Sequence, residues 1–128
     1  MEVNMMRAEM IREPVTTFKL DSKDELSAII DLAQAIAGRF KLDTQTLKSS
    51  ILASEVQGTQ IIAGHIALTH GSDTQIKTPE IVQTSFDTPI LWGSVATKVD
   101  QVLTVLVPSH YSDTDYTALK DQLIAEFE

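Results

Sequence analysis

Three histidines, His65, His70 and His110, are the side chains of this chain best suited to chemistry near neutral pH. The chain has no cysteine, which excludes thiol nucleophiles, disulfides and thiolate zinc sites. His70 follows the mostly apolar segment 66–69 and precedes Gly71, so we expect it at the end of a buried strand where glycine permits a sharp turn. An imidazole there can act as a base, a nucleophile or a metal ligand. An isolated histidine more commonly has a structural role, with a half-buried ring whose nitrogen forms a hydrogen bond with a backbone carbonyl.

Metal and nucleotide chemistry have little support in the motifs. His65 and His70 are an odd number of residues apart, so on a strand they face opposite sides unless a bulge intervenes. The HExxH zinc motif is missing, and so are the GxxxxGK[ST] and GxGxxG phosphate loops and the GxSxG nucleophile elbow. The sequence therefore predicts no metal and no cofactor.

Length and composition indicate one soluble globular domain. The 128 residues are 43% hydrophobic and 22% charged, which allows a real core. The formal net charge of −8 argues against nucleic acid as a partner, and suits a partner with a basic docking surface. There is no apolar core of signal-peptide length and no apolar run long enough to span a membrane, so we expect a cytoplasmic protein.

The strongest periodicity predicts a helix over 23–37. Ser22 and Glu25 have the spacing of a capping box, and Gly38 stands where the helix is expected to end. The apolar residues recur at helical spacing between them and are interpreted as core.

Two further helices are predicted. Asp43 is a candidate N-cap for a shorter helix that ends near Glu55. Asp113 is a candidate cap for a last amphipathic helix, whose apolar face includes Tyr116.

The remaining segments favour strands. A nearly continuous apolar run over 99–107 is typical of a central strand buried on both faces. Other strands are expected at 15–20, 59–71, 80–86 and 90–93, with a loop at 71–79 and a turn at 87–89. Trp92 is interpreted as core. The predicted fold is α/β, a single mixed β-sheet flanked by helices, with an N-terminal arm over 1–17 and one domain over 18–128.

Three segments carry a resemblance to a known family. Residues 66–71 resemble its apolar strand that ends in Pro-His-Gly, residues 88–93 resemble its Pro-Ile-x-Trp-Gly segment, and residues 99–108 resemble its long strand that ends in Val-Pro. In this order, after the expected helices, they are similar to the enzyme IIA domain of the fructose/mannitol type (type 2) of the bacterial sugar phosphotransferase system. The resemblance covers residues from about 18 to about 123.

The resemblance implies a specific chemistry for His70. In such domains the histidine before the glycine accepts a phosphoryl group from the histidine phosphocarrier protein. It then passes the group to a cysteine of a IIB domain or protein of a sugar transporter. A neutral imidazole nitrogen is a competent nucleophile at neutral pH, and the protein has to position the group and stabilise its charge. No metal or cofactor is implied, and the sugar depends on the partner domains.

Two departures from the family pattern lie beside His70 in the sequence. Thr69 stands where proline is usual, and its hydroxyl can bind a phosphate oxygen. His65 stands where glycine is usual, which makes this part of the site more crowded. Unless the fold brings it within hydrogen-bond reach of His70, Thr69 is an ordinary polar residue.

Two further departures concern the charge around the phosphate. Ser54-Glu55 aligns with an Arg-Glu pair, so the arginine that usually binds the phosphate is absent. Asp115 aligns with a second histidine, while His110 lies five residues earlier and can fold back toward the site. Glu55 could orient His70, and its simpler interpretation is a solvated charge at the end of a helix. For His110 the simpler interpretation is a loop position.

Two functional hypotheses follow, with a third as the background case. The first is a working phosphotransferase component with a phosphohistidine intermediate at His70. The second is a regulatory or binding version that docks phosphotransfer proteins with weak or no phosphoryl transfer. The third is a small α/β domain with no phosphoryl role. We favour the first because His70 and its glycine are retained.

Overall fold

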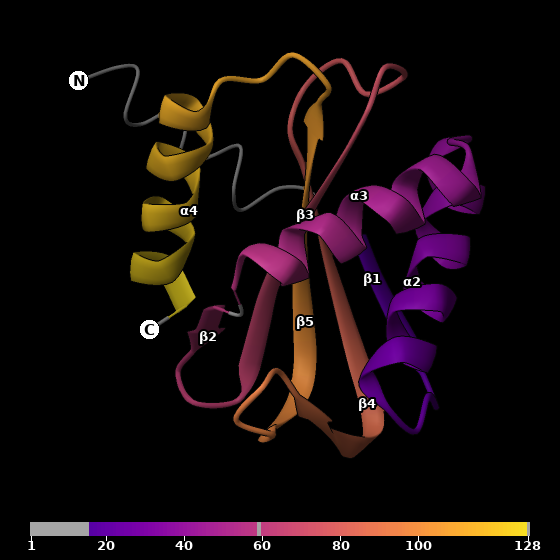
Figure 1. Cartoon of the computed structure of the whole chain (residues 1–128), viewed down its shortest axis with the longest axis vertical. Helices are drawn as coiled ribbons and strands as arrows, with labels where there is room; N and C mark the ends of the chain where they lie inside the picture. Colours follow the sequence, from indigo (N-terminus) through magenta and orange to yellow (C-terminus); the bar gives the residue numbers. More distant parts are fainter. Residues whose placement is uncertain (1–15, 59, 128) are drawn as a thin grey trace.

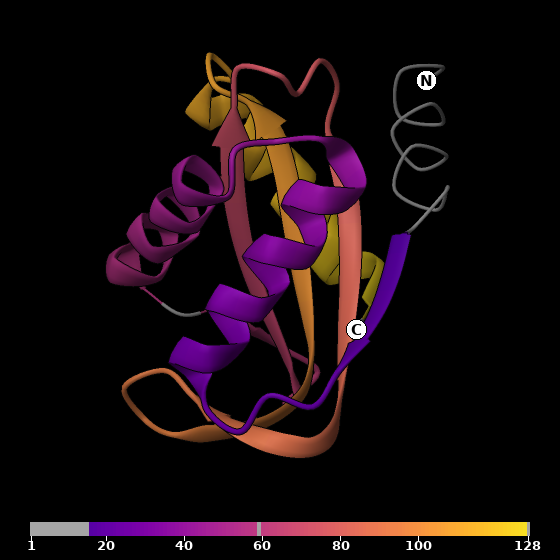
Figure 2. The same cartoon turned by 90° about the vertical axis from the view of Figure 1, so that its right-hand side faces the viewer.

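The computed structural model describes residues 16–58 and 60–127 and shows one mixed sheet with helices on both faces (Figures 1 and 2). The predicted α/β class is therefore confirmed. The elements, in chain order, are β1 (Thr16–Leu20), α2 (Glu25–Phe40), α3 (Thr44–Gln57), β2 (Gln60–Ile62), β3 (Ile66–Asp73), β4 (Glu80–Trp92), β5 (Thr97–Pro108) and α4 (Asp113–Phe127).

The sheet has the strand order β1-β4-β5-β3-β2. β1 is parallel to β4, β4 is antiparallel to β5, β5 is parallel to β3, and β3 is antiparallel to β2. β5 is thus central, and its residues from Val102 to Pro108 are all buried, as the apolar run predicted.

The helices divide between the two faces of the sheet. α2 and α3 pack on one face, where β5 contributes Val102 and Leu106 to the core. α4 packs on the other face against Leu103 and Val105 of the same strand (Figure 2). Alternate residues of one strand therefore supply two separate cores, as expected for a strand covered on both sides.

The predicted ends of α2 are corrected. Asp24, not Ser22, is the N-cap, because its carboxylate accepts the backbone N–H of Ser27 at 2.8 Å. The Ser22 hydroxyl donates instead to Asp31 at 2.7 Å. At the other end the helix passes through Gly38 and ends after Phe40, where Lys41 takes the left-handed conformation with φ 59°.

The starts of α3 and α4 each have a side-chain cap. Asp43 caps α3, as predicted, by accepting the backbone N–H of Thr46 at 2.8 Å. For α4 the capping oxygen belongs to Ser112, which accepts the backbone N–H of Asp115 at 3.0 Å. Asp113 is the first residue of that helix rather than its cap.

Two predicted strand boundaries are also wrong. β3 continues beyond Gly71 to Asp73, so His70 lies inside the strand and the loop begins later. The segment 87–89 is an irregularity inside β4, between Ser85 and Ile90, rather than a turn between two strands. The strand expected over 59–71 is divided into β2 and β3 by a turn, in which Gly64 has φ 78°.

The expected N-terminal arm over 1–17 lies almost wholly outside the described residues. Its last two residues, Thr16 and Thr17, begin β1 and pair with Val82 and Gln83 of β4.

Candidate functional site

The site is built on a stretch of β3 that β2 does not cover. β2 pairs with Ile66–Leu68, and from Thr69 onward no strand among the described residues pairs with the outer edge of β3. Two serines one turn apart on α3 bind the backbone groups there. Ser54 Oγ accepts the N–H of His70 at 3.2 Å, and Ser50 Oγ accepts the N–H of Ser72 at 2.8 Å. The two serines are four residues apart and lie on the same side of α3. They therefore face the N–H groups of His70 and Ser72, which point outward from the same edge of β3. In this way α3 takes the place of a neighbouring strand.

Gly71 allows α3 to come this close. Its φ is not positive, so no unusual backbone conformation demands glycine here. A Cβ at this position would lie 2.8 Å from Leu47 Cδ1 and 3.1 Å from Ile51 Cγ1, both on α3. The glycine next to His70 therefore serves close packing of helix against strand, and not the sharp turn that the sequence suggested.

The imidazole of His70 is held on one side and open on the other. Ser54 Oγ lies 3.0 Å from Nδ1. The ring packs against the ring of Tyr116 on α4, with 4.3 Å between centroids and 42° between planes. The ring is half-buried, and no hydrogen bond joins Nε2 to any of the described residues. One nitrogen is thus anchored while the other is available for chemistry.

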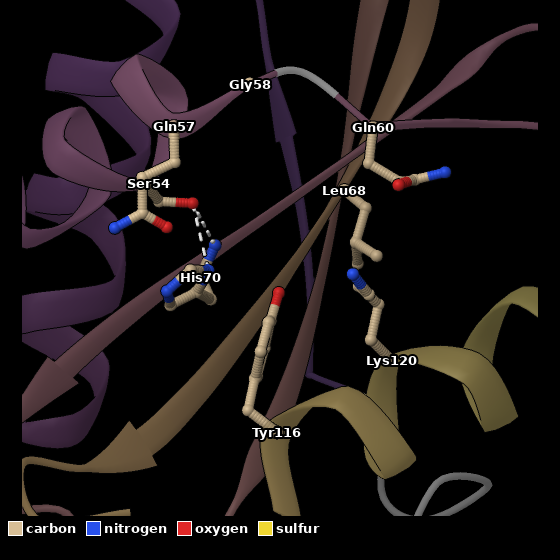
Figure 3. A pocket seen from close by; sticks show the side chains of 8 residues that line it. All are labelled: Ser54, Gln57, Gly58, Gln60, Leu68, His70, Tyr116 and Lys120. Carbon is tan, nitrogen blue, oxygen red and sulfur yellow. Dashed lines mark hydrogen bonds between the residues drawn. The ribbon is translucent and has the colours of Figure 1, made fainter. Parts of the chain in front are cut away.

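Two cavities flank His70. The first, which we call the Lys120 cavity, has a volume of about 280 Å³ (Figure 3). It is lined by Ser54, Gln57, Gly58, Gln60, Leu68, His70, Tyr116 and Lys120. The second, the Asp113 cavity, has a volume of about 210 Å³. Its lining includes Ser50, Ser54, His70, Ser72, Asp113 and Tyr116. Among the described residues, Lys120 is the sole ionisable cation of the first lining apart from His70, and Asp113 is the sole carboxylate of the second.

The surroundings favour a neutral imidazole. Burial lowers the pKa of His70 below its ordinary value of 6.5, and the positive charge of Lys120 lowers it further. The negative charge of Asp113 opposes this shift. Burial, with the negative charge of Glu55, raises the pKa of Tyr116 to about 12. At neutral pH the site therefore offers a neutral imidazole and a protonated phenol.

Two of the predicted supporting residues meet at His70. Ser54 binds both Nδ1 and the backbone N–H of His70. Thr69 is buried and donates its hydroxyl to Ser54 Oγ at 3.3 Å, so it reaches His70 only through Ser54. Glu55 is neither a solvated charge nor bound to His70, because its Oε1 accepts the indole N–H of Trp92 at 2.7 Å. Trp92 is fully buried, which confirms it as core.

The other three predicted residues lie elsewhere. His65 is in the turn before β3, where its Nδ1 lies 2.7 Å from Asp100 Oδ1. His110 and Asp115 are exposed, His110 before α4 and Asp115 in its first turn. None of the three lines either cavity beside His70.

The structure adds Asp113, Tyr116 and Lys120 to the site. Sequence periodicity places Tyr116 on the apolar face of the last helix and assigns no role to Lys120. A signal was present in the spacing of three and four residues, which places all three on one face of a helix. That signal could not show that this face meets His70, because α4 packs on the opposite side of the sheet from α3.

The described residues contain neither a metal-binding cluster nor a membrane-spanning helix. No group of three or more His, Asp or Glu side chains there is arranged to hold a metal ion. No helix there is long and apolar enough to cross a membrane.

The sequence matches, over residues 9–124, the family described as "Phosphoenolpyruvate-dependent sugar phosphotransferase system, EIIA 2". The chain belongs to this family. No sequence among the curated proteins matches it significantly.

Solved structures share the fold at low sequence identity. The nitrogen regulatory protein IIA-Ntr from Neisseria meningitidis has a TM-score of 0.73 and 13% identity, with 88% of this chain and 77% of that chain covered. A PTS IIA (PtxA) from Streptococcus mutans has a TM-score of 0.66 and 16% identity, with coverage of 97% and 78%. Enzyme IIAMTL from Escherichia coli, in complex with phosphorylated enzyme IIBMTL, has a TM-score of 0.63 and 12% identity, with coverage of 88% and 82%.

Proposed function

We propose that this domain is a phosphoryl carrier of a sugar phosphotransferase system, with His70 as the acceptor. The observation that carries the proposal is the half-buried imidazole of His70, anchored at Nδ1 by Ser54 and open at Nε2 beside a cavity. Membership of the enzyme IIA type 2 family supports the same role. The donor would be the histidine phosphocarrier protein and the recipient a IIB domain or protein, as the family resemblance implies.

The proposed step uses the lone pair of Nε2. That pair attacks phosphorus, a P–N bond to His70 forms, and the P–N bond to the donor histidine breaks with its electron pair left on the donor nitrogen. During this step the ring proton is on Nδ1, and the Nδ1–H group donates a hydrogen bond to Ser54 Oγ. The lowered pKa of His70 favours the neutral ring that the attack requires. Onward transfer to the IIB partner reverses these roles.

The test is phosphorylation by the proposed donor. The full chain is incubated with phosphoenolpyruvate, enzyme I and the histidine phosphocarrier protein, and the intact mass is measured before and after acid treatment. We expect an acid-labile gain of one phosphoryl group that maps to His70. His70→Ala should abolish the gain, while His110→Ala, a matched change at an exposed histidine, should leave it intact. A gain that survives His70→Ala would refute the proposal.

One observation favours a second candidate, a regulatory domain that docks phosphotransfer proteins. Among the residues that the structure describes, no arginine lines either cavity beside His70, and arginine is the usual partner of a phosphate in this family. The two candidates differ in the second transfer. A carrier passes the phosphoryl group from His70 to a IIB protein within the turnover time of transport, whereas a regulatory domain retains it or never acquires it.

A further inference from the structure

One face of α4 presents three side chains to His70 in a row. Asp113, Tyr116 and Lys120 are three and four residues apart, which places them on the same side of the helix. Tyr116, in the middle, packs its ring on the imidazole. Asp113 lines the cavity on one side of His70, and Lys120 lines the cavity on the other.

The two ends of this row carry opposite charges. A phosphoryl group on His70 is an anion, so Lys120 attracts it and Asp113 repels it. Both charges act at the ring, because Lys120 lowers the pKa of His70 and Asp113 raises it. The charge of α4 therefore selects the Lys120 cavity as the side on which a phosphoryl group is stabilised.

We propose that the Lys120 cavity is a phosphate-binding site in which Lys120 supplies the cation and the Tyr116 hydroxyl supplies a hydrogen bond. In this protein the cation would thus come from α4, and not from the α3 position where Ser54 stands. The inference rests on the proposed function in assigning the bound phosphate to His70.

The state of both side chains suits this role. Lys120 forms no ion pair or hydrogen bond with any residue in 16–58 or 60–127, so its ammonium group is available to a ligand. The raised pKa of Tyr116 keeps its hydroxyl protonated and able to donate. Figure 3 shows both side chains rising from α4 into the cavity, with the Tyr116 hydroxyl toward the space beside His70.

The experiment uses two small probes that need no protein partner. The affinity for inorganic phosphate is measured by NMR from the ring signals of His70. The rate at which phosphoramidate, a chemical phosphoryl donor, modifies His70 is measured by mass spectrometry. The variants are Lys120→Gln, Lys120→Arg and, as a control with the same charge change at an exposed position on β5, Lys98→Gln.

We expect Lys120→Gln to weaken phosphate binding by about tenfold, as for the loss of one charge-assisted hydrogen bond. The same variant should slow modification of His70 by phosphoramidate. Lys120→Arg should keep most of the phosphate affinity and most of the modification rate, and Lys98→Gln should resemble the parent in both. If Lys120→Gln binds phosphate as tightly as Lys98→Gln, the inference is overturned. A chain that binds phosphate through Lys120 but gains no phosphoryl group from the phosphocarrier protein would refute the proposed function and leave this inference standing.

Discussion

The hydroxyl of Ser54 lies 3.0 Å from Nδ1 of His70 and also accepts two hydrogen bonds. Its oxygen accepts the backbone N–H of His70 at 3.2 Å and the hydroxyl of Thr69 at 3.3 Å. A hydroxyl has two lone pairs and one hydrogen, so its hydrogen is left for Nδ1. In the resting protein the neutral ring therefore carries its proton on Nε2. Attack by Nε2 requires that proton to move to Nδ1 and the Ser54 hydroxyl to turn.

The first prediction concerns this tautomer. Nitrogen-15 NMR at neutral pH should show His70 mainly in the Nε2–H form. Ser54→Ala should remove that preference, because Nδ1 loses its donor. Ser50→Ala is the matched control, since it removes an equivalent serine that binds the N–H of Ser72.

Both serine variants should be less stable than the parent by about 1–3 kcal/mol, because each leaves a strand N–H without its acceptor. Only Ser54→Ala should change the ring signals of His70. Equal tautomer populations in the parent, or a change of the same size in Ser50→Ala, would contradict the assignment.

The second prediction tests why glycine follows His70. Gly71→Ala should lower the free energy of unfolding by about 1–3 kcal/mol, because the new methyl group overlaps Leu47 and Ile51. Gly38→Ala is the control, in an exposed position inside α2 where a Cβ meets nothing within 4 Å. It should stabilise the protein by about 0.5–1 kcal/mol, because alanine favours a helix over glycine. Urea unfolding measures both, and equal effects of the two changes would rule out the packing explanation.

The sequence predicted the fold well because its signals are local. The central strand, the helices and the Asp43 cap follow from periodicity and capping within a few residues. The cap of α2 was misplaced because Ser22 and Asp24 both suit the position. The choice depends on a distant contact, since Glu25 accepts the backbone N–H of Gly93 at 2.9 Å instead of completing a capping box.

The site was predicted only in part. The family resemblance pointed to His70. It also singled out Ser54, which stands where the family usually has an arginine. Tyr116 and Lys120 were missed because their role depends on how α4 crosses the sheet. Glu55 was misjudged for the same reason, since its partner Trp92 is 37 positions away in the chain.

The third prediction concerns pH. The pKa of His70 is lowered in the folded protein, so above 6.5 the ring is neutral in both folded and unfolded chains. Below 6.5 the unfolded chain binds a proton first, and stability is lost as the pH falls through the lower pKa of the folded state. Compared with His70→Asn, which does not titrate, the parent should lose stability as the pH falls below 6.5, because the pKa of His70 is lowered in the folded protein.

An NMR titration of His70 separates the causes of this shift. Lys120→Gln should raise the midpoint, because it removes a positive charge, and Asp113→Asn should lower it. A midpoint above 6.5 in the parent, or a parent that gains stability relative to His70→Asn as the pH falls, would contradict a lowered pKa for His70.

The last prediction concerns the link between α3 and the end of β4. Trp92 is fully buried, and its indole N–H donates to Glu55 Oε1 at 2.7 Å. Glu55→Ala should destabilise the protein by about 1–3 kcal/mol, because a buried donor loses its acceptor, whereas Glu55→Gln keeps an amide oxygen and should cost less. Trp92 is the only tryptophan, so its fluorescence reports unfolding directly. Because Glu55 also raises the pKa of Tyr116, both variants should lower that pKa from about 12. If Glu55→Gln proves as unstable as Glu55→Ala, the hydrogen bond is not what holds α3 against β4.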